Sequence, residues 1–299
     1  MIPPLASFRT PVPVEVHQIV HPAVPGNLDG ATILHVSDLH IRRWAARTFQ
    51  WTDSFLRLLG RVRPDVIAIT GDLMTERADE PAAVRILARM LEVTRPNAPG
   101  GIVGIFGNHD TTHFRAQARA LSGVHWLDPA GRVEMTVSRL SGAAIRFVGC
   151  SWPEDWLGAA IDAGREGSPL APNPSKPGAG PLTIALTHTP DHLPVLARLG
   201  VPIVLAGHTH GGQVRLPIPL RSPGGGRWRS WAPHNSTGLP RAKSSGIVQA
   251  GSTLCAISRG VGTQFLDIRL GCPWHVPLYV LRRGELGPAR AGVSLVEAW

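Results

Sequence analysis

The sequence has no apolar run close to the roughly 20 residues that a membrane-spanning helix needs. Its N-terminal segment also lacks the basic stretch followed by an apolar stretch that marks a secretory signal, which predicts a cytoplasmic location. Cysteine is scarce, and Cys150, Cys255 and Cys272 lie far apart and form no C-x-x-C pair. This spacing argues against a disulfide framework and predicts buried thiols in a reducing compartment.

Lysine is almost absent, because Lys176 and Lys243 are the only ones and arginine carries most of the net charge of +9. A surplus of positive charge suits phosphates, nucleic acid or an acidic membrane surface, and it equally fits a bias in genome composition. Peripheral contact with the inner membrane surface is therefore an option beside a purely cytoplasmic location. Nucleic-acid binding has charge alone behind it, since no zinc-finger, basic-zipper or RNP pattern is present.

Apolar runs that predict strands alternate with stretches of helical spacing in the first half of the chain, which favours an α/β fold. Antiparallel pairs are expected late in the second half. The predicted strands lie within residues 12–20, 31–40, 64–72, 101–110, 132–140, 143–151, 182–188, 201–210, 246–263 and 275–283. The predicted helices lie within residues 48–62, 80–94, 114–122 and 191–200.

We predict a single domain over residues 1–299, since this length can build one large core. Residues 1–11 are expected to form a loosely ordered tail, and the Pro/Gly-rich residues 164–181 a loop. Residues 214–246 form a basic Gly/Pro-rich stretch, which is either a lid that recruits an anionic substrate or an insertion without a fixed role.

Five of the apolar strands end in side chains that can bind a metal ion. An isolated His-x-His, as in "LAGHTHGGQ", is also typical of a polar strand end, but five such ends favour a site. In α/β sheets ligands bind at the carboxyl edge of the strands, where residues distant in sequence converge. The candidate ligands are Asp38, His40, Asp72, Asn108, His188, His208 and His210, and His109 lies among them. The eight other histidines, such as His17 and His275, are expected to be surface or satisfied structural residues.

This set has two carboxylates, one amide oxygen and four imidazoles, too many donors for one ion of four to six ligands. Two divalent ions that share a bridging carboxylate fit it better, and the mixture of oxygen and nitrogen favours Mn²⁺, Fe or Zn²⁺ over Mg²⁺. Such a pair lowers the pKa of a bridging water, so that hydroxide can attack phosphorus near neutral pH.

The blocks "SDLH", "TGD", "GNHD", "THTP" and "AGHTHGG" occur in this order between residues 31 and 213. They resemble the five signature blocks of the calcineurin-like metallophosphoesterase superfamily. The later "ISRGVGT…LGCP" resembles the closing segment of a bacterial branch of these phosphohydrolases and extends the likeness to about residue 281. This branch includes UDP-diacylglucosamine pyrophosphohydrolases and many enzymes of unknown substrate. The resemblance implies a four-layer αββα sandwich of two mixed sheets flanked by helices.

The resemblance also implies roles for residues. It assigns Asp38, His40, Asp72 and His210 to a first metal ion, and Asp72, Asn108, His188 and His208 to a second. His109 would be the general acid or a clamp on the scissile phosphate, and Asp110 would orient its neighbours rather than bind metal. Arg42 and Arg43 either grip a second phosphate or form a solvated helix start.

The resulting expectation is a dinuclear metal-dependent phosphohydrolase that acts on a phosphodiester, pyrophosphate or phosphomonoester. Its substrate would be a phosphate-containing small molecule or a lipid-linked one, although no apolar segment precedes the first block. One alternative is a scaffold that has the fold without catalysis and binds partners through a basic surface. Another is a different binuclear hydrolase, metallo-β-lactamase-like or amidohydrolase-like, but in these the His-x-His normally follows an early strand.

Overall fold

A computed structural model describes most of the chain between residues 14 and 286. The described residues are 14–43, 46–140, 143–156, 181–214, 216–218, 229–231, 244–264 and 268–286, with side chains left undescribed at 46–51, 216–218 and 229–231. The predicted tail at 1–11 and nearly all of the predicted loop at 164–181 lie outside them. Within 214–246, β10 (Leu216–Ile218) and β11 (Arg229–Trp231) form an antiparallel pair.

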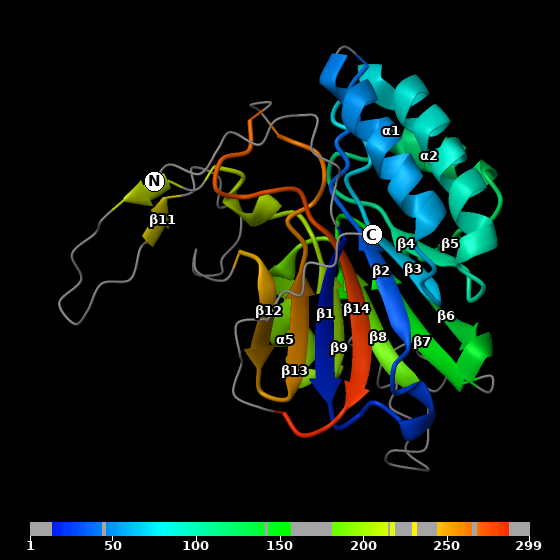
Figure 1. The fold of residues 1–299 in the computed structure, drawn as a ribbon, viewed down its shortest axis with the longest axis vertical. Helices are drawn as coiled ribbons and strands as arrows, with labels where there is room; N and C mark the ends of the chain where they lie inside the picture. The colour runs from blue at the N-terminus through cyan, green and yellow to red at the C-terminus, as the bar shows by residue number, and fades with distance from the viewer. Residues whose placement is uncertain are drawn as a thin grey trace.

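Two six-stranded mixed sheets form the framework (Figure 1). The first has the order β1 (Val14–His21), β14 (Val276–Arg283), β2 (Thr32–Val36), β3 (Val66–Thr70), β4 (Ile102–Ile105) and β5 (His125–Trp126). The second has the order β12 (Gly246–Ala250), β13 (Thr253–Ile257), β9 (Ile203–Ala206), β8 (Leu182–Thr187), β7 (Ala143–Cys150) and β6 (Ala130–Val137). In each sheet four neighbouring strands are parallel, so their carboxyl ends lie at one edge.

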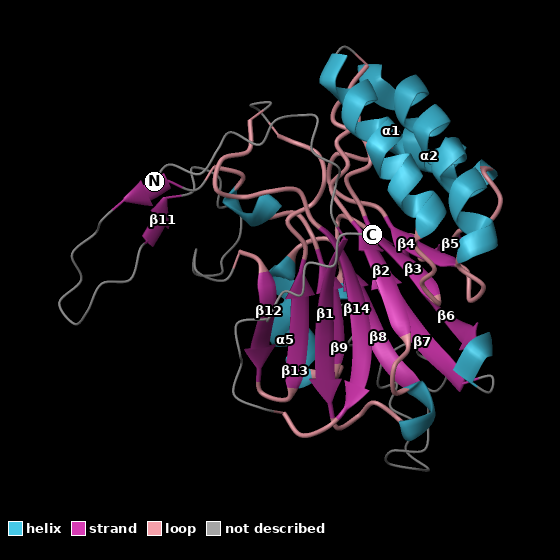
Figure 2. Ribbon diagram, viewed as in Figure 1, coloured by secondary structure: helices cyan, strands magenta, loops and turns pink. Residues whose placement is uncertain are grey.

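The strands of this parallel core are apolar on both faces because each sheet is covered on both sides. In β3, Val66 and Ala68 pack between the two sheets, whereas Ile67 and Ile69 pack against helices on the outer face. α1 (Ala46–Arg61), α2 (Glu80–Thr94) and α3 (Thr112–Ala120) cover the first sheet, and α5 (Leu193–Arg198) covers the second. Figure 2 shows the layers, which confirm the predicted αββα sandwich.

The predicted edge strand at 12–20 is confirmed, since β1 lies at the edge of the first sheet. The expectation of late antiparallel pairs holds for β12 and β13 but is incomplete. β13 is parallel to β9, and β14 returns to the first sheet, where it runs parallel to β1 and antiparallel to β2. The two-residue strand β5 has no apolar run of its own and was not predicted.

All three cysteines are buried and unpaired, as predicted. Among the described residues, no helix is both long and apolar enough to cross a membrane.

Candidate metal centre

The backbone turns sharply after three of the five strands that carry candidate ligands, namely β2, β3 and β9. Among the described residues, six other than glycine have a positive φ, and five of these are candidate ligands: Asp38, His40, Asp72, His208 and His210, with φ between 42° and 66°. This left-handed region is unfavourable for side chains with a Cβ, and residues held in it cluster at functional sites. The strain in this protein is therefore concentrated at one edge of the sandwich.

Hydrogen bonds between the turns hold this strained geometry. The backbone N–H of Asp38 donates to Gly71 O at 3.0 Å, and that of His40 donates to Asp72 O at 3.0 Å. The edges of the two sheets meet at Gly207, where a Cβ would lie 1.9 Å from Ser37 Oγ. Position 207 thus favours glycine, because a side chain there would push the end of β9 away from the end of β2.

One group of side chains is built around His210. Its Nε2 lies 3.1 Å from Nε2 of His40 and 3.6 Å from Oδ1 of Asp38. The Nε2 atom of His40 in turn lies 3.4 Å from Oδ2 of Asp72. All four side chains are buried.

A second group is built around His188. Its Nε2 lies 3.2 Å from Oδ2 of Asp72, 3.1 Å from Nδ1 of His208 and 2.9 Å from Oδ1 of Asn108. Asp72 contributes the same oxygen to both groups. Asn108 is exposed and His208 partly so, which leaves this side of the centre accessible.

The donor atoms have the separation that a shared ion requires. Two nitrogen or oxygen ligands at ~2.1 Å from one ion in tetrahedral geometry lie ~3.4 Å apart. The contacts within the two groups run from 2.9 to 3.6 Å. Imidazole nitrogens that face one another at such distances gain most when a cation lies between them, so the residues present fit two metal ions.

The buried carboxylates and imidazoles of the two groups shift one another's pKa values. Burial disfavours the charge on Asp72, but His188 and His40 hold the pKa of its carboxyl well below its usual range. Burial likewise disfavours protonation of His188, yet the carboxylates of Asp72 and Asp38 raise the pKa of this imidazole to about 10. In the metal-free protein His188 therefore carries a proton, and its positive charge partly balances the negative charge of Asp72 and Asp38.

Residues 31–212 match the family model of the calcineurin-like phosphoesterases. The chain belongs to this family. The uncharacterized metallophosphoesterase YkuE of Bacillus subtilis strain 168 is 26% identical over 271 residues, which cover 89% of this chain and 84% of that protein. YkoQ of the same organism, also an uncharacterized metallophosphoesterase, is 27% identical over 189 residues, or 62% and 63% of the two chains. The crystal structure of a dimetal phosphatase from Danio rerio is similar over 78% of this chain and 88% of that one, with 11% identity and a TM-score of 0.41.

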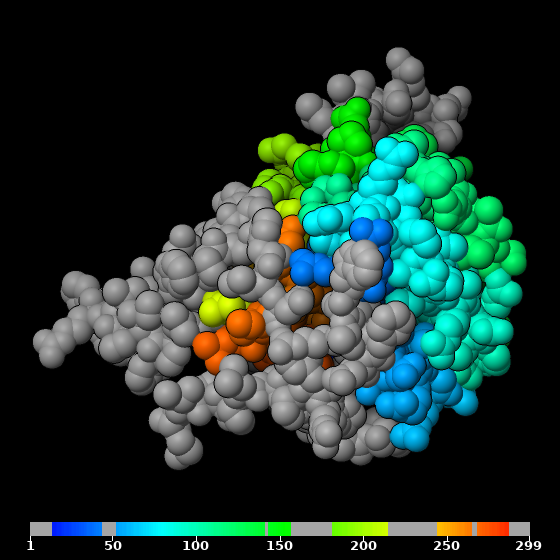
Figure 3. Space-filling view, turned by 90° about the horizontal axis from the view of Figure 1, so that it is seen from above, coloured from blue at the N-terminus to red at the C-terminus, as the bar shows by residue number. Residues whose placement is uncertain are grey.

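The resemblance inferred from the five sequence blocks is thereby confirmed, and the chain is a metal-dependent phosphoesterase. Its family model ends at residue 212, before the closing segment. In this phosphoesterase the closing segment lies against the turn that follows β2, because Gly262 N–H donates to Asp38 O at 2.7 Å. Figure 3 shows this end of the molecule, where the chain before α1 (blue), the region around α2 (cyan) and the chain after β13 (orange) lie side by side.

His109 of the phosphoesterase lies beside both groups. Its Nδ1–H donates to Thr75 O at 2.8 Å, and its ring centroid lies 4.8 Å from that of His40. Its Nε2 is 2.7 Å from the side-chain nitrogen of Gln264. Gln264 is held through its own backbone by Gln213, at 2.7 and 2.9 Å.

Two buried carboxylates support the ligand turns without joining either group. Asp110 accepts hydrogen bonds from the backbone N–H groups of Asp72, Gly107 and Leu73, each at 2.9 Å. Glu154 accepts from the backbone N–H of His188 and pairs with His192 at 2.9 Å. The sequence analysis missed Glu154, because a lone glutamate after a strand carries no distinctive pattern.

The two arginines that follow the first block differ in position. The Nε–H of Arg42 donates to Oγ1 of Thr75 at 3.3 Å, and this hydroxyl lies 3.4 Å from Nδ1 of His40. Arg43 is exposed, and its backbone N–H donates to Asp79. Arg42 is thus the one that reaches the edge of the centre. A third arginine, Arg269, was not singled out from the sequence; it is buried and its guanidinium donates to the carbonyl oxygens of Arg259 and Gly262.

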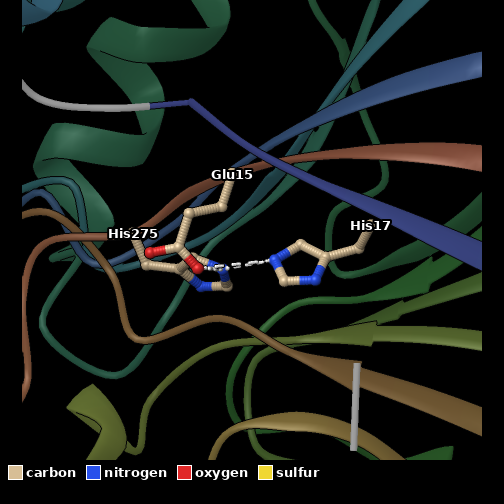
Figure 4. A group of neighbouring side chains, drawn as sticks. All are labelled: Glu15, His17 and His275. Atoms are coloured by element: carbon tan, nitrogen blue, oxygen red, sulfur yellow. Dashed lines mark hydrogen bonds and ion pairs between the residues drawn. The ribbon is translucent and has the colours of Figure 1, made fainter. Parts of the chain in front are cut away.

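Glu15, His17 and His275 form a further group of possible metal ligands at the starts of β1 and β14 (Figure 4). Here the backbone N–H of Arg259 donates to Nδ1 of His275 at 3.2 Å, so the proton of the neutral imidazole lies on Nε2. Burial and the charge of Arg259 lower the pKa of His275 well below its usual value, which keeps the ring neutral. His275 therefore directs an N–H rather than a lone pair toward Nε2 of His17, at 3.2 Å. We interpret this group as a set of hydrogen bonds that joins β1 to β14 rather than as a metal site.

Proposed function

We propose that this phosphoesterase is a hydrolase with a dinuclear metal centre. The first ion would be held by Asp38, His40, Asp72 and His210, and the second by Asp72, Asn108, His188 and His208. The observation that carries the proposal is the position of Asp72, whose Oδ2 is within 3.4 Å of His40 and 3.2 Å of His188. The mixture of oxygen and imidazole donors favours Mn²⁺, Fe or Zn²⁺.

When bound, the two ions supply Lewis-acid activation of a water nucleophile and neutralise negative charge on the phosphoryl group. The chain's own residues orient the rest of the reaction. Because Nδ1–H of His109 donates to Thr75 O, Nε2 is the ring atom left to act on the substrate. In the imidazolium form its N–H can deliver a proton to the departing oxygen or hold the phosphoryl group. We place Arg42 at the rim, where its guanidinium can meet a second phosphate.

The substrate class is a phosphodiester, pyrophosphate or phosphomonoester, on a small molecule or a lipid-linked one. A silent scaffold is not proposed, because all seven candidate ligands lie in the two groups. A single domain, a cytoplasmic location, peripheral contact with the inner membrane surface and a lid at 214–246 stay predictions from the sequence.

The test is a reconstitution assay. Protein freed of metal with a chelator is assayed before and after addition of Mn²⁺, Fe²⁺ or Zn²⁺ against bis-p-nitrophenyl phosphate, p-nitrophenyl phosphate and a nucleotide-sugar pyrophosphate. We expect turnover of at least one of these compounds that depends on added metal. No turnover with any pairing of metal and compound contradicts the proposal.

Metal binding should release a proton from His188. Its pKa of about 10 in the metal-free protein means that Nε2 carries a proton at neutral pH, and coordination requires this proton to leave. The apparent affinity should therefore rise about tenfold per pH unit below pH 10 and level off above it. Calorimetric titration with Zn²⁺ in two buffers of different ionisation enthalpy measures the released protons, and equal heats in both buffers would contradict this expectation.

A further inference from the structure

Two residues of the sequence blocks have no role so far, Ser37 of "SDLH" and Thr70 of "TGD". The structure joins them in a row with His35. Oγ of Ser37 lies 2.5 Å from Oδ2 of Asp38, Oγ1 of Thr70 lies 2.8 Å from Oγ of Ser37, and Nε2 of His35 lies 2.8 Å from Oγ1 of Thr70. His35, Thr70 and Ser37 are completely buried.

The chemistry of these groups fixes the direction of every hydrogen bond in the row. The hydroxyl of Ser37 donates to the carboxylate of Asp38, which can only accept when ionised. The hydroxyl of Thr70 donates to Ser37, so it has no second proton for His35. The ring of His35 must then donate its Nε2–H to Thr70, and all three donors point toward Asp38.

This arrangement leaves Nδ1 of His35 with a lone pair and no partner. Among the described residues it is the one buried side-chain nitrogen or oxygen without a hydrogen bond. The expectation that the histidines outside the blocks are surface or satisfied residues is therefore wrong for His35. Burial lowers the pKa of His35 to about 3, so the ring stays neutral.

An apolar side chain would fill this position without leaving a polar atom unpaired. His35 lies two residues after Ile33 in β2 and so faces the space between the sheets, where its ring is 5.9 Å from that of Tyr279. An unpaired buried atom calls for an explanation, and the row that ends on Asp38 provides one.

We propose that His35, Thr70 and Ser37 form a positioning row that holds Oδ2 of Asp38 and turns Oδ1 toward the ion at His40 and His210. The inference rests on the proposed dinuclear centre. Oδ1 of Asp38 lies 3.6 Å from Nε2 of His210, whereas Oδ2 lies 2.5 Å from Ser37. Hydrogen bonds in a row polarise one another at low dielectric, and partners of metal-binding side chains orient them. The side chains of the row reach one proposed ligand, Asp38 of the first ion, so removing a hydroxyl of the row should weaken the binding of one of the two ions.

The test uses Thr70→Val, which keeps the shape of the side chain and removes the hydroxyl that links the row. The backbone carbonyl of Thr70, which accepts from Nδ1 of His188 at 2.7 Å, is retained. We expect about tenfold weaker affinity for one of the two ions, in the range typical of such partners. Competition of Co²⁺ or Zn²⁺ with a chromophoric chelator measures both affinities, and the visible absorption of bound Co²⁺ reports the changed coordination.

Thr70→Ser restores the hydroxyl and should restore both the affinity and the Co²⁺ spectrum. Thr253→Val is the matched control, because Thr253 is buried in a strand of the other sheet and its hydroxyl donates to Val201 O. Ser37→Ala removes the last donor of the row and serves if Thr70→Val does not fold. Wild-type affinity for both ions in Thr70→Val or Ser37→Ala, or an equal loss of both, overturns the inference.

Asp38→Asn separates this inference from the proposed centre. If Asp38→Asn binds both ions normally, the assignment of the first ion is wrong. If Asp38→Asn loses one ion while Thr70→Val binds two as tightly as the wild type, the centre stands and only the positioning row is wrong.

Discussion

Asp72→Asn is expected to abolish metal-dependent turnover and to reduce bound metal at both positions. The amide has nearly the shape of the carboxylate but no negative charge, and Asp72 is the residue that contacts His40 and His188 through one oxygen. Two cations without this bridging charge would repel each other in a buried site. Elemental analysis after reconstitution gives the metal content, and hydrolysis of bis-p-nitrophenyl phosphate gives the rate.

The control for this variant is Asp65→Asn at the other end of the same strand. Asp65 is also buried but forms an ion pair with Arg139 at 2.5 Å, so its loss should lower stability and leave metal content unchanged. His208→Ala, which removes a proposed ligand of the second ion, should also abolish turnover and lower the amount of bound metal. Full activity or a full complement of metal in Asp72→Asn would overturn the assignment.

The positions of the proposed ligands could be predicted because each lies directly after a short apolar strand. β2 ends at Val36 with Asp38 and His40 next, and β9 ends at Ala206 with His208 and His210 next. Parallel strands bring such ends to one edge whatever their distance in sequence. The alternation of apolar runs and helical stretches was therefore enough to predict the fold class, and the polar residues after the strands were enough to predict that these side chains lie close together.

Contacts between distant segments could not be predicted in this way. Gln264 meets His109 across 155 positions, and β14 returns between β1 and β2, because both depend on where the closing segment packs. In the sequence, His35 looks like an ordinary structural histidine within an apolar strand. Only the positions of Thr70 and Ser37 in the structure show that its ring donates a hydrogen bond toward Asp38. The contacts of Gln264 and His35 are with residues distant in sequence, so the sequence alone does not predict them.

His109→Ala is expected to keep both metal ions and to lower the rate ~10²–10⁴-fold. His109 lies beside His40 and its backbone N–H donates to Oδ1 of Asp72 at 2.9 Å, a bond that the variant retains. His113→Ala is the matched control, since His113 lies four residues away, is 63% exposed and pairs with Glu80. Loss of metal from His109→Ala would instead make His109 a ligand, as its distance to His40 and Asp72 also permits.

The leaving group distinguishes the two roles that His109 could have. A general acid matters most when the departing oxygen is strongly basic, and little for p-nitrophenolate, which leaves without a proton. A clamp on the phosphoryl group would act alike on all esters. Rates of wild type and His109→Ala on a series of aryl and alkyl phosphodiesters measure the difference. If His109 donates a proton, the deficit of the variant grows as the leaving group becomes more basic, and a constant deficit across the series assigns it to holding the phosphate.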